Sequence, residues 1–151
     1  MIRLALPDEA EAVRSLSAAA YLPVYLPLYN RPPMPAREDY GPRIARGEVW
    51  MADIDGRLAA VLVLERQADH LLLYSIAIHP AFQGQGLAVK LLAFADDRAK
   101  EAGISEIRLY TNEKMLRNQA IYARAGYREI GRRPHPNQSG LMLVDMAKKL
   151  D

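Results

Sequence analysis

The residues with the clearest chemical potential are two glycines between a strand-like segment and a helical one. The stretch "IAIHPAFQGQGLAVKLL" (Ile76–Leu92) begins with apolar residues, passes through Gly84-Gln85-Gly86 and continues with apolar residues at helical spacing. Glycines at such a junction allow close approach to the backbone, and N–H groups at a helix N-terminus attract anions. The pattern predicts a phosphate-binding loop. The alternative is a tight strand-to-helix connection that holds no ligand.

Two common nucleotide-binding loops do not fit this stretch. The dinucleotide fingerprint G-x-G-x-x-G requires a third glycine where this sequence has Val89. A P-loop requires four residues between its glycines and then Lys-Ser/Thr, and neither condition is met. Both kinds of loop are therefore excluded on residue types.

A longer pattern around the glycines and a second motif downstream are more specific. Gln83–Ala88 matches Q/R-x-x-G-x-G/A and opens an amphipathic helix, and Ala120–Tyr127 fits A-I-x-x-x-x-G-aromatic. With both motifs in this order of elements, the sequence resembles the GNAT superfamily of acyl-CoA-dependent N-acetyltransferases. The resemblance covers about residues 48–149, and residues 1–47 fit it only loosely.

The resemblance implies acetyl-CoA as co-substrate. The loop N–H groups would hold its diphosphate, and the preceding strand would pair with its pantetheine arm like an added strand. The residues expected to bind it are Ile76, Ala77, Ile78, Gln83, Gly84, Gln85, Gly86, Leu87, Ala88, Val89 and Asn118.

Tyr122 is the candidate acid, because the resembled family has a tyrosine here that reaches the CoA sulfur. A phenol (pKa about 10) is a weaker acid than a thiol (about 8.5), so full proton transfer would be uphill by about 2 kcal/mol. We therefore expect Tyr122 to donate a hydrogen bond to the developing thiolate. The alternative is a partly buried tyrosine on an amphipathic helix. Many family members have Asn where Met115 stands, while Asn118 shares the helical face of Tyr122.

The base and the acceptor pocket are less sharply indicated. Glu65 and Tyr74 are the candidate bases, each able to face the cleft or simply to pack. His79 precedes Pro80 and is expected to have a structural or CoA-proximal role, and Asn112 is expected to cap a helix. The candidate residues for binding the amine are Tyr21, Tyr25, Tyr29 and Arg31, and Arg132–Gly140 would form the opposite wall. A packed surface loop is the alternative for the tyrosines.

Hydrophobic spacing predicts the elements that would carry these residues. We expect a strand at Ile2–Leu6, a helix from Pro7 to Tyr21, and a loop with short helical turns over 21–42, because six prolines there oppose a regular helix. Asp55-Gly56 predicts a tight hairpin turn. The remaining expected elements are a helix near Glu38–Arg46, strands flanking the hairpin, a strand at His70–Ile78 buried on both faces, a helix ending at Gly103, a strand at Ser105–Thr111, a helix ending at Gly126 and two closing strands. The fold class is mixed α/β (α+β), GNAT-like by resemblance, with a mainly antiparallel twisted sheet flanked by helices in a single domain, 1–151.

Composition limits the other functions. The net charge of +2 is too balanced to imply nucleic acid, and no apolar run of about 18 residues suggests a membrane span. With no cysteine and no metal-ligand spacing of histidines, no metal site is expected. The N-terminus does not resemble a secretory signal, so a cytoplasmic location is the expectation. We expect an acetyltransferase acting on a small-molecule amine, with a peptide or protein amine or a non-catalytic acyl-CoA sensor as alternatives; homodimers are common in the resembled family.

Overall fold

The computed structural model describes residues 1–151 and contains helices and strands in the expected alternation. The strands form a sheet of order β1-β2-β3-β4-β5-β7-β6, in which β4–β5 is parallel and the pairs β1–β2, β2–β3, β5–β7 and β6–β7 are antiparallel. This confirms the predicted mixed class with a mainly antiparallel sheet flanked by helices. The strands are β1 (Ile2–Leu4), β2 (Val49–Ile54), β3 (Arg57–Arg66), β4 (Leu71–Ile78), β5 (Glu106–Asn112), β6 (Arg128–Pro134) and β7 (Met142–Lys149), and the helices are α1 (Ala10–Tyr29), α2 (Gly41–Ala45), α3 (Leu87–Glu101) and α4 (Leu116–Arg124).

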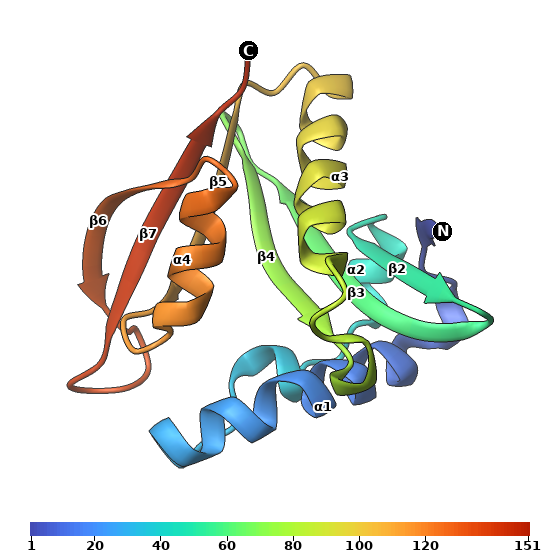
Figure 1. The fold of residues 1–151 in the computed structure, drawn as a ribbon, viewed down its shortest axis with the longest axis horizontal. Helices are drawn as coiled ribbons and strands as arrows, with labels where there is room; N and C mark the ends of the chain where they lie inside the picture. The colour runs from blue at the N-terminus through green and yellow to red at the C-terminus, as the bar shows by residue number, and fades with distance from the viewer. The chain divides into compact units, whose positions relative to one another are not determined.

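The chain, whose helices and strands are labelled in Figure 1, divides into two compact units that alternate along the sequence. The first unit comprises Met1–Leu64 and Ser75–Leu91, and the second comprises Glu65–Tyr74 and Leu92–Asp151. Both β4 and α3 contribute residues to each unit. The glycine loop therefore belongs to the first unit and α4 to the second.

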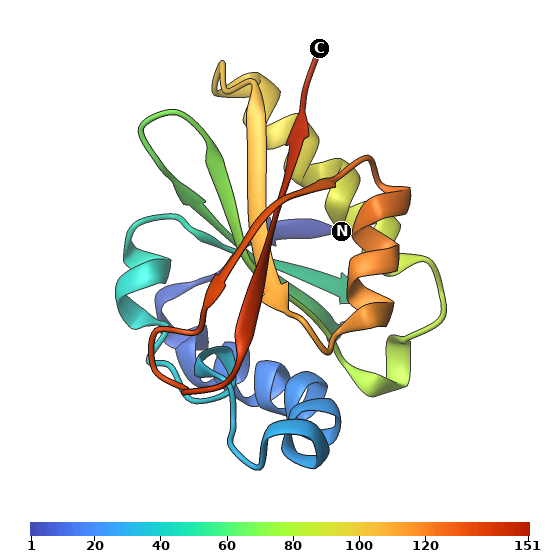
Figure 2. The same cartoon turned by 90° about the vertical axis from the view of Figure 1, so that its left-hand side faces the viewer.

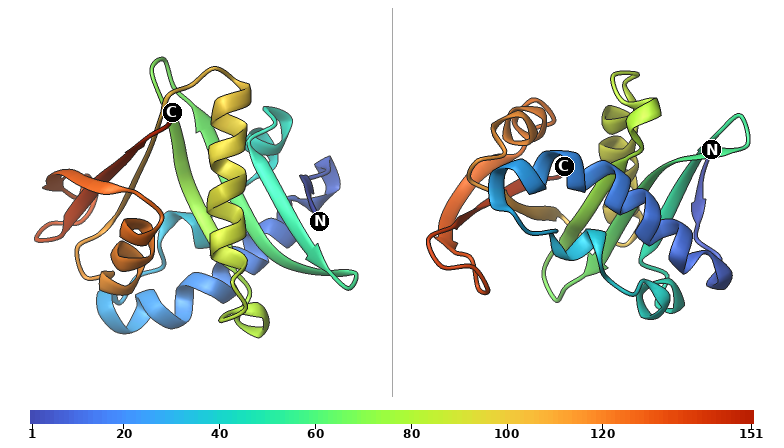
Figure 3. Two further views of the ribbon diagram at one scale, coloured as in Figure 1. Left: turned by 45° about the horizontal axis from the view of Figure 1, so that its top comes forward. Right: turned by 90° about the horizontal axis from the view of Figure 1, so that it is seen from below.

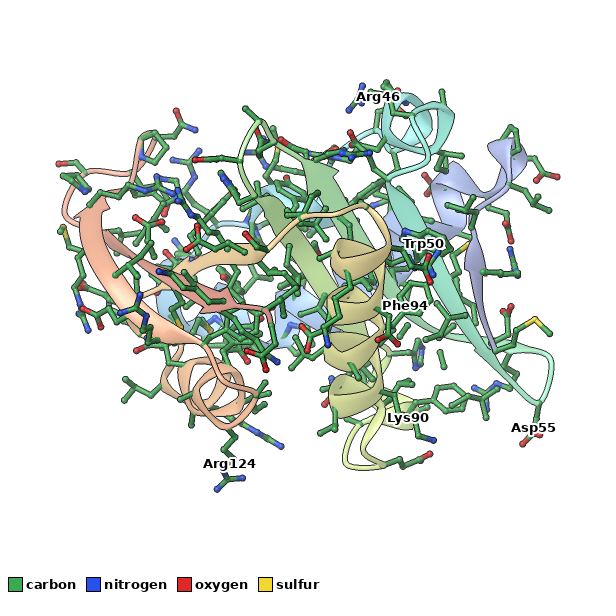
Figure 4. The ribbon with its side chains drawn as sticks, turned by 90° about the horizontal axis from the view of Figure 1, so that it is seen from above. Arg46, Trp50, Asp55, Lys90, Phe94 and Arg124 are labelled. Atoms are coloured by element: carbon green, nitrogen blue, oxygen red, sulfur yellow. The ribbon has the colours of Figure 1, made fainter.

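The β2–β3 hairpin of the first unit forms as the sequence predicts. Asp55 and Gly56 both have positive φ angles, 51° and 76°, as a two-residue type I′ turn requires, and Asp55 lies at the tip of the hairpin (Figure 4). Residues 59–64 of β3 are all buried, since consecutive small and branched apolar side chains fill both faces of that strand. In β4, by contrast, buried residues alternate with half-buried ones, so the prediction of burial on both faces was wrong for that strand.

Helix α1 is the main departure from the sequence-based expectation. The prolines at 23 and 27 predicted a loop from residue 21 onward, whereas the helix continues through both of them to Tyr29 and ends at Asn30, whose φ is +54°. A proline inside a helix removes one hydrogen bond and costs about 3 kcal/mol relative to Ala. The carbonyls that lose this bond belong to Ala19, which is half-buried, and Pro23, which is exposed.

Three tyrosines on the other side of α1 provide the compensating contacts. The rings of Tyr21 and Tyr25 lie 5.7 Å apart in an edge-to-face arrangement, and those of Tyr25 and Tyr29 lie 5.3 Å apart. Their spacing of four residues places them on one helical stripe, and such aromatic pairs are favourable. Figure 3 shows α1 crossing the end of β4 that belongs to the same unit. We infer that packing of these tyrosines offsets the destabilising effect of the two prolines inside the helix.

In the second unit, β7 pairs with β5 on one side and β6 on the other (Figure 2), and the core lies along β5 and β7. Buried residues from β5 and β7 fill it, namely Ile107, Leu109, Leu143, Val144 and Met146. β6, at the end of the sheet, is exposed along almost its whole length. No helix of the chain combines the length and the apolar character that crossing a membrane requires.

Candidate active site

The glycine loop presents a continuous run of backbone donors. Gly84 and Gly86 have φ angles of +77° and +78°, a region that other residues avoid, and Lys90 is the first residue of the helical segment whose N–H bonds a carbonyl, that of Gly86. The six N–H groups of Gly84–Val89 make no backbone hydrogen bond. Because they lie at the positive end of α3, the loop can bind an anionic group without any basic side chain.

The glycines are required by backbone conformation rather than by lack of space. A Cβ built on Gly84 or Gly86 meets no atom within 4 Å, so the surroundings of the loop are open. Gln83, Gly84, Gln85 and Gly86 are exposed, whereas Leu87 is buried and anchors the start of α3 in the core. An open donor run above a fixed helix start fits a diphosphate.

Two side-chain contacts hold the segment before the loop in shape. The Nδ1 atom of His79 accepts a hydrogen bond from the N–H of Ala81 at 3.0 Å, which gives His79 the structural role expected of it. Phe82 is buried, and the guanidinium of Arg57 lies 5.0 Å from its ring centroid. Arg57 thus brings a positive charge next to the loop from β3, a contact for which the sequence has no signal.

The strand predicted to carry the pantetheine arm has its backbone groups facing the required way. The N–H of His79 donates to the Ala59 carbonyl of β3 at 2.9 Å. Since backbone groups alternate in direction along a strand, those of Ile78 and Ile76 point away from β3. Their carbonyls already accept hydrogen bonds from side chains, Ile78 from Gln83 at 3.1 Å and Ile76 from Tyr21 at 3.1 Å. The side chain of Ala77, which lies between these two residues and points to the opposite face of the strand, is buried.

Tyr122 is held in α4 by the aromatic residue of its motif. Tyr122 is buried at 8% exposure, and its ring meets that of Tyr127 edge to face at 6.0 Å. The N–H of Tyr127 donates to the Tyr122 carbonyl at 3.0 Å. Burial, together with the negative charge of Asp96 and the neighbouring Tyr122, raises the pKa of Tyr127, so its phenol stays neutral and serves packing.

Gly126 allows the chain to turn between these two tyrosines. Its φ angle is +103°, and a Cβ there would lie 3.2 Å from Cε of Lys148. Lys148 is itself fixed by an ion pair of 2.6 Å with Asp96 of α3. The glycine of the second motif is therefore required both by conformation and by the close approach of this side chain.

The start of α4 differs from the expectation. Asn112 does not cap the helix; Met115 occupies the position before its first residue, and Met115 is buried at 5% exposure. The Nε2 atom of Gln119 donates to the carbonyls of Asn112 and Glu113, which ties the helix to the end of β5. The physical reason is that Asn112 is still the last residue of β5, three residues before the cap position of α4. Asn118 is half-buried on the same helix as Tyr122.

The two candidate bases lie in the second unit. Glu65, at the end of β3, is half-buried and its carboxylate accepts a hydrogen bond of 2.6 Å from the Gln67 side chain. Tyr74 is half-buried in β4. A carboxylate fixed by an amide could act as a base, and the role of each residue stays a prediction.

The predicted acceptor residues are the tyrosine stripe of α1 and the chain that follows it. Tyr21, Tyr25 and Tyr29 are half-buried, and Arg31 is exposed just beyond the helix end. In the second unit, residues 132–140 are mostly exposed, and the Nδ1 atom of His135 accepts from the N–H of Asn137. No group of three or more His, Cys, Asp or Glu side chains could hold a metal ion.

The family of the chain follows from comparison with known proteins. The acetyltransferase (GNAT) family model matches residues 11–127, which include the glycine loop, Tyr122 and Tyr127. The chain therefore belongs to the acetyltransferase (GNAT) family, a family of acyltransferases.

A relative and several solved structures agree with this assignment. The [ribosomal protein bS18]-alanine N-acetyltransferase of Haemophilus ducreyi is 31% identical over 94 residues, which are 60% of this chain and 65% of that protein, so the match spans less than two thirds of the relative. The ribosomal-protein-S18-alanine N-acetyltransferase from Escherichia coli has a TM-score of 0.79 at 19% identity and covers 100% of this chain and 94% of that one. The PaiA N-acetyltransferase from Thermoplasma acidophilum, in complex with coenzyme A, has a TM-score of 0.81 at 18% identity, with 99% and 98% covered. These two structures show a shared fold.

Proposed function

We propose that this protein transfers the acetyl group of acetyl-CoA to a primary amine by direct attack of the amine on the thioester. The observation that carries the proposal is the run of six N–H donors from Gly84 to Val89 at the start of α3, in a chain of the acetyltransferase family. The complex of the Thermoplasma acidophilum relative with coenzyme A supports the choice of co-substrate. A diphosphate is the anionic group of that co-substrate with the oxygens to accept several such donors at once.

The chain's own residues would act on a thioester, which supplies the activated acyl group. The loop donors bind the diphosphate and so fix the arm along Ile76 and Ile78 of β4. Tyr122 donates a hydrogen bond to the sulfur as negative charge develops there, which lowers the barrier to its departure. Glu65 or Tyr74 takes the proton that the amine loses, directly or through water.

The kind of amine decides how much the base must contribute. A lysine-like amine costs about 4–5 kcal/mol to deprotonate at neutral pH, and an α-amine only about 1 kcal/mol. Our first choice is a small-molecule primary amine. The second candidate is the α-amine of a peptide or protein, favoured by the alanine N-acetyltransferase named as a relative. A cytoplasmic location and a homodimer remain predictions.

A screen of CoA release across polyamines, amino acids, aminoglycosides and short peptides tests the activity directly. We expect turnover with at least one class of amine. Tyr122→Phe should then lower kcat by about 10- to 100-fold, because one donor to the transition state is lost, and leave acetyl-CoA affinity by calorimetry unchanged. Unchanged kcat would remove Tyr122 from the mechanism. Tight acetyl-CoA binding without turnover on any amine would instead identify a non-catalytic sensor.

A further inference from the structure

The hydroxyl of Tyr21 is bound to the strand segment that the proposed function assigns to the acyl-CoA arm. It lies 2.9 Å from Oγ of Ser75 and donates to the carbonyl of Ile76 at 3.1 Å. Because the Tyr21 proton is directed at Ile76, Ser75 is the donor in the first contact. Ser75 is only 2% exposed, so this chain of two hydrogen bonds is anchored in the protein interior, where such bonds strengthen each other.

The two carbonyls on this edge of β4 differ in how firmly they are occupied. Gln83, which bonds the Ile78 carbonyl, is an exposed residue on the glycine loop, and its amide can exchange that bond for one to a ligand. Tyr21 is held at Ile76 both by Ser75 and by its ring contact with Tyr25. At this edge of β4, a ligand can therefore replace the hydrogen bond to the Ile78 carbonyl, whereas the hydrogen bond to the Ile76 carbonyl stays in place. We call these the exchangeable Ile78 position and the fixed Ile76 position.

The fixed position connects the strand to the predicted amine site. Tyr21 is the first member of the tyrosine stripe of α1, in which Tyr25 and Tyr29 follow at ring distances of 5.7 and 5.3 Å. A helix whose first tyrosine is bound to β4 has its later tyrosines set at defined positions relative to that strand. Exposed prolines on the opposite side of α1 weaken the helix itself, so this contact helps to keep the later tyrosines in place.

We propose that Tyr21 is a positioning residue for the amine: its hydroxyl, bound to Ser75 and to the Ile76 carbonyl, fixes the amine-binding stripe of α1 against the strand that carries the acyl-CoA arm. The proposal rests on the proposed function, because it assigns the α1 tyrosines to the amine. Acetyl-CoA does not need the hydroxyl, since the loop donors and the exchangeable Ile78 position remain without it. Loss of the hydroxyl should therefore weaken use of the amine and spare binding of acetyl-CoA.

Tyr21→Phe removes the hydroxyl and keeps the ring. We expect the KM for the best amine of the screen to rise about tenfold, and the calorimetric Kd for acetyl-CoA to change less than twofold. Ser75→Ala should shift the same KM in the same direction by less. The double variant should be no worse than Tyr21→Phe, because the two hydroxyls act as one unit. The matched control is Tyr40→Phe, which loses a buried tyrosine-to-carbonyl hydrogen bond to Pro35 and should leave both constants unchanged.

Hydrogen exchange over residues 18–29 provides a readout that does not need turnover. We expect amides in this part of α1 to exchange several-fold faster in Tyr21→Phe than in the wild type. Unchanged exchange, or faster exchange with an unchanged amine KM, would overturn the role of Tyr21, and so would a loss confined to acetyl-CoA binding. A wild type that binds acetyl-CoA but turns over no amine refutes the proposed function and this role with it, whereas an active wild type with a silent Tyr21→Phe refutes the role alone.

Discussion

Substitution of Gly86 tests whether the loop donors bind a diphosphate. Gly86 has a φ angle of +78°, where an L residue costs roughly 1–2 kcal/mol of stability. Its Cβ position is open, so Gly86→Ala should fold without a steric clash. In the complex, the added methyl group would occupy the space that the ligand must enter. If two charge-assisted hydrogen bonds of about 1.5 kcal/mol each are lost, acetyl-CoA binds about 100-fold more weakly.

The control must separate backbone strain from crowding of the ligand. Gly47, which follows α2, also has a positive φ, +72°, and open space at its Cβ, so Gly47→Ala should cost similar stability and leave acetyl-CoA affinity unchanged. Gly86→Asn provides a second comparison, because Asn tolerates left-handed backbone better than Ala yet has a larger side chain. Gly86→Asn should be more stable than Gly86→Ala because Asn tolerates the left-handed backbone. If crowding of the ligand weakens binding, Gly86→Asn should still bind acetyl-CoA no more tightly than Gly86→Ala. Calorimetric affinity of folded Gly86→Ala within threefold of the wild type would refute the diphosphate assignment.

Three further substitutions have defined outcomes. Arg57→Ala removes the charge over Phe82 beside the loop, and acetyl-CoA should bind about fivefold more weakly at low salt, with a smaller loss at high salt because the charge is exposed; a loss independent of salt would contradict this. Glu9→Gln removes the carboxylate whose pKa Arg3 holds below its usual 4.5, so it should destabilise the protein by about 0.5 kcal/mol at neutral pH. That difference should disappear as the pH falls through the lowered pKa, since wild-type Glu9 is then protonated, as urea unfolding at a series of decreasing pH values would show. Pro27→Ala restores an N–H to the carbonyl four residues earlier and should raise the Tm of the protein by several degrees; a lower Tm would show that Pro27 itself stabilises the native structure.

The features predicted correctly are those that depend on local backbone chemistry. Asp55-Gly56 could be assigned to a hairpin because few residue pairs adopt two successive positive φ angles. The tight strand-to-helix turn could be predicted for a related reason, since Gly84 and Gly86 both occupy the left-handed region before helix α3, while its ligand stays a prediction. In each case the backbone conformation restricts which residue types can occupy the position, and distant parts of the chain do not alter that restriction.

The features that were missed depend on contacts between residues distant in sequence. Arg57 reaches the loop only because β3 places it over Phe82, and nothing near Arg57 in the sequence indicates this. Gln119 gave no signal either, because the carbonyls that it satisfies become available only where β5 ends. Side chains of this kind position a site without belonging to a motif, so they can be identified only from the fold.

Helix α1 shows how a tertiary contact can reverse a sound local rule. Prolines at positions 23 and 27 make an isolated helix unfavourable, yet the tyrosine stripe on the other side holds it together. Within the first unit, the hydrogen bonds of Tyr21 to Ser75 and Ile76 anchor this stripe to β4. It follows that the C-terminal half of α1 should be the part of the first unit that opens most easily once that hydroxyl is lost. A helix stabilised in this way can be displaced at low cost, which suits an element proposed to admit an amine.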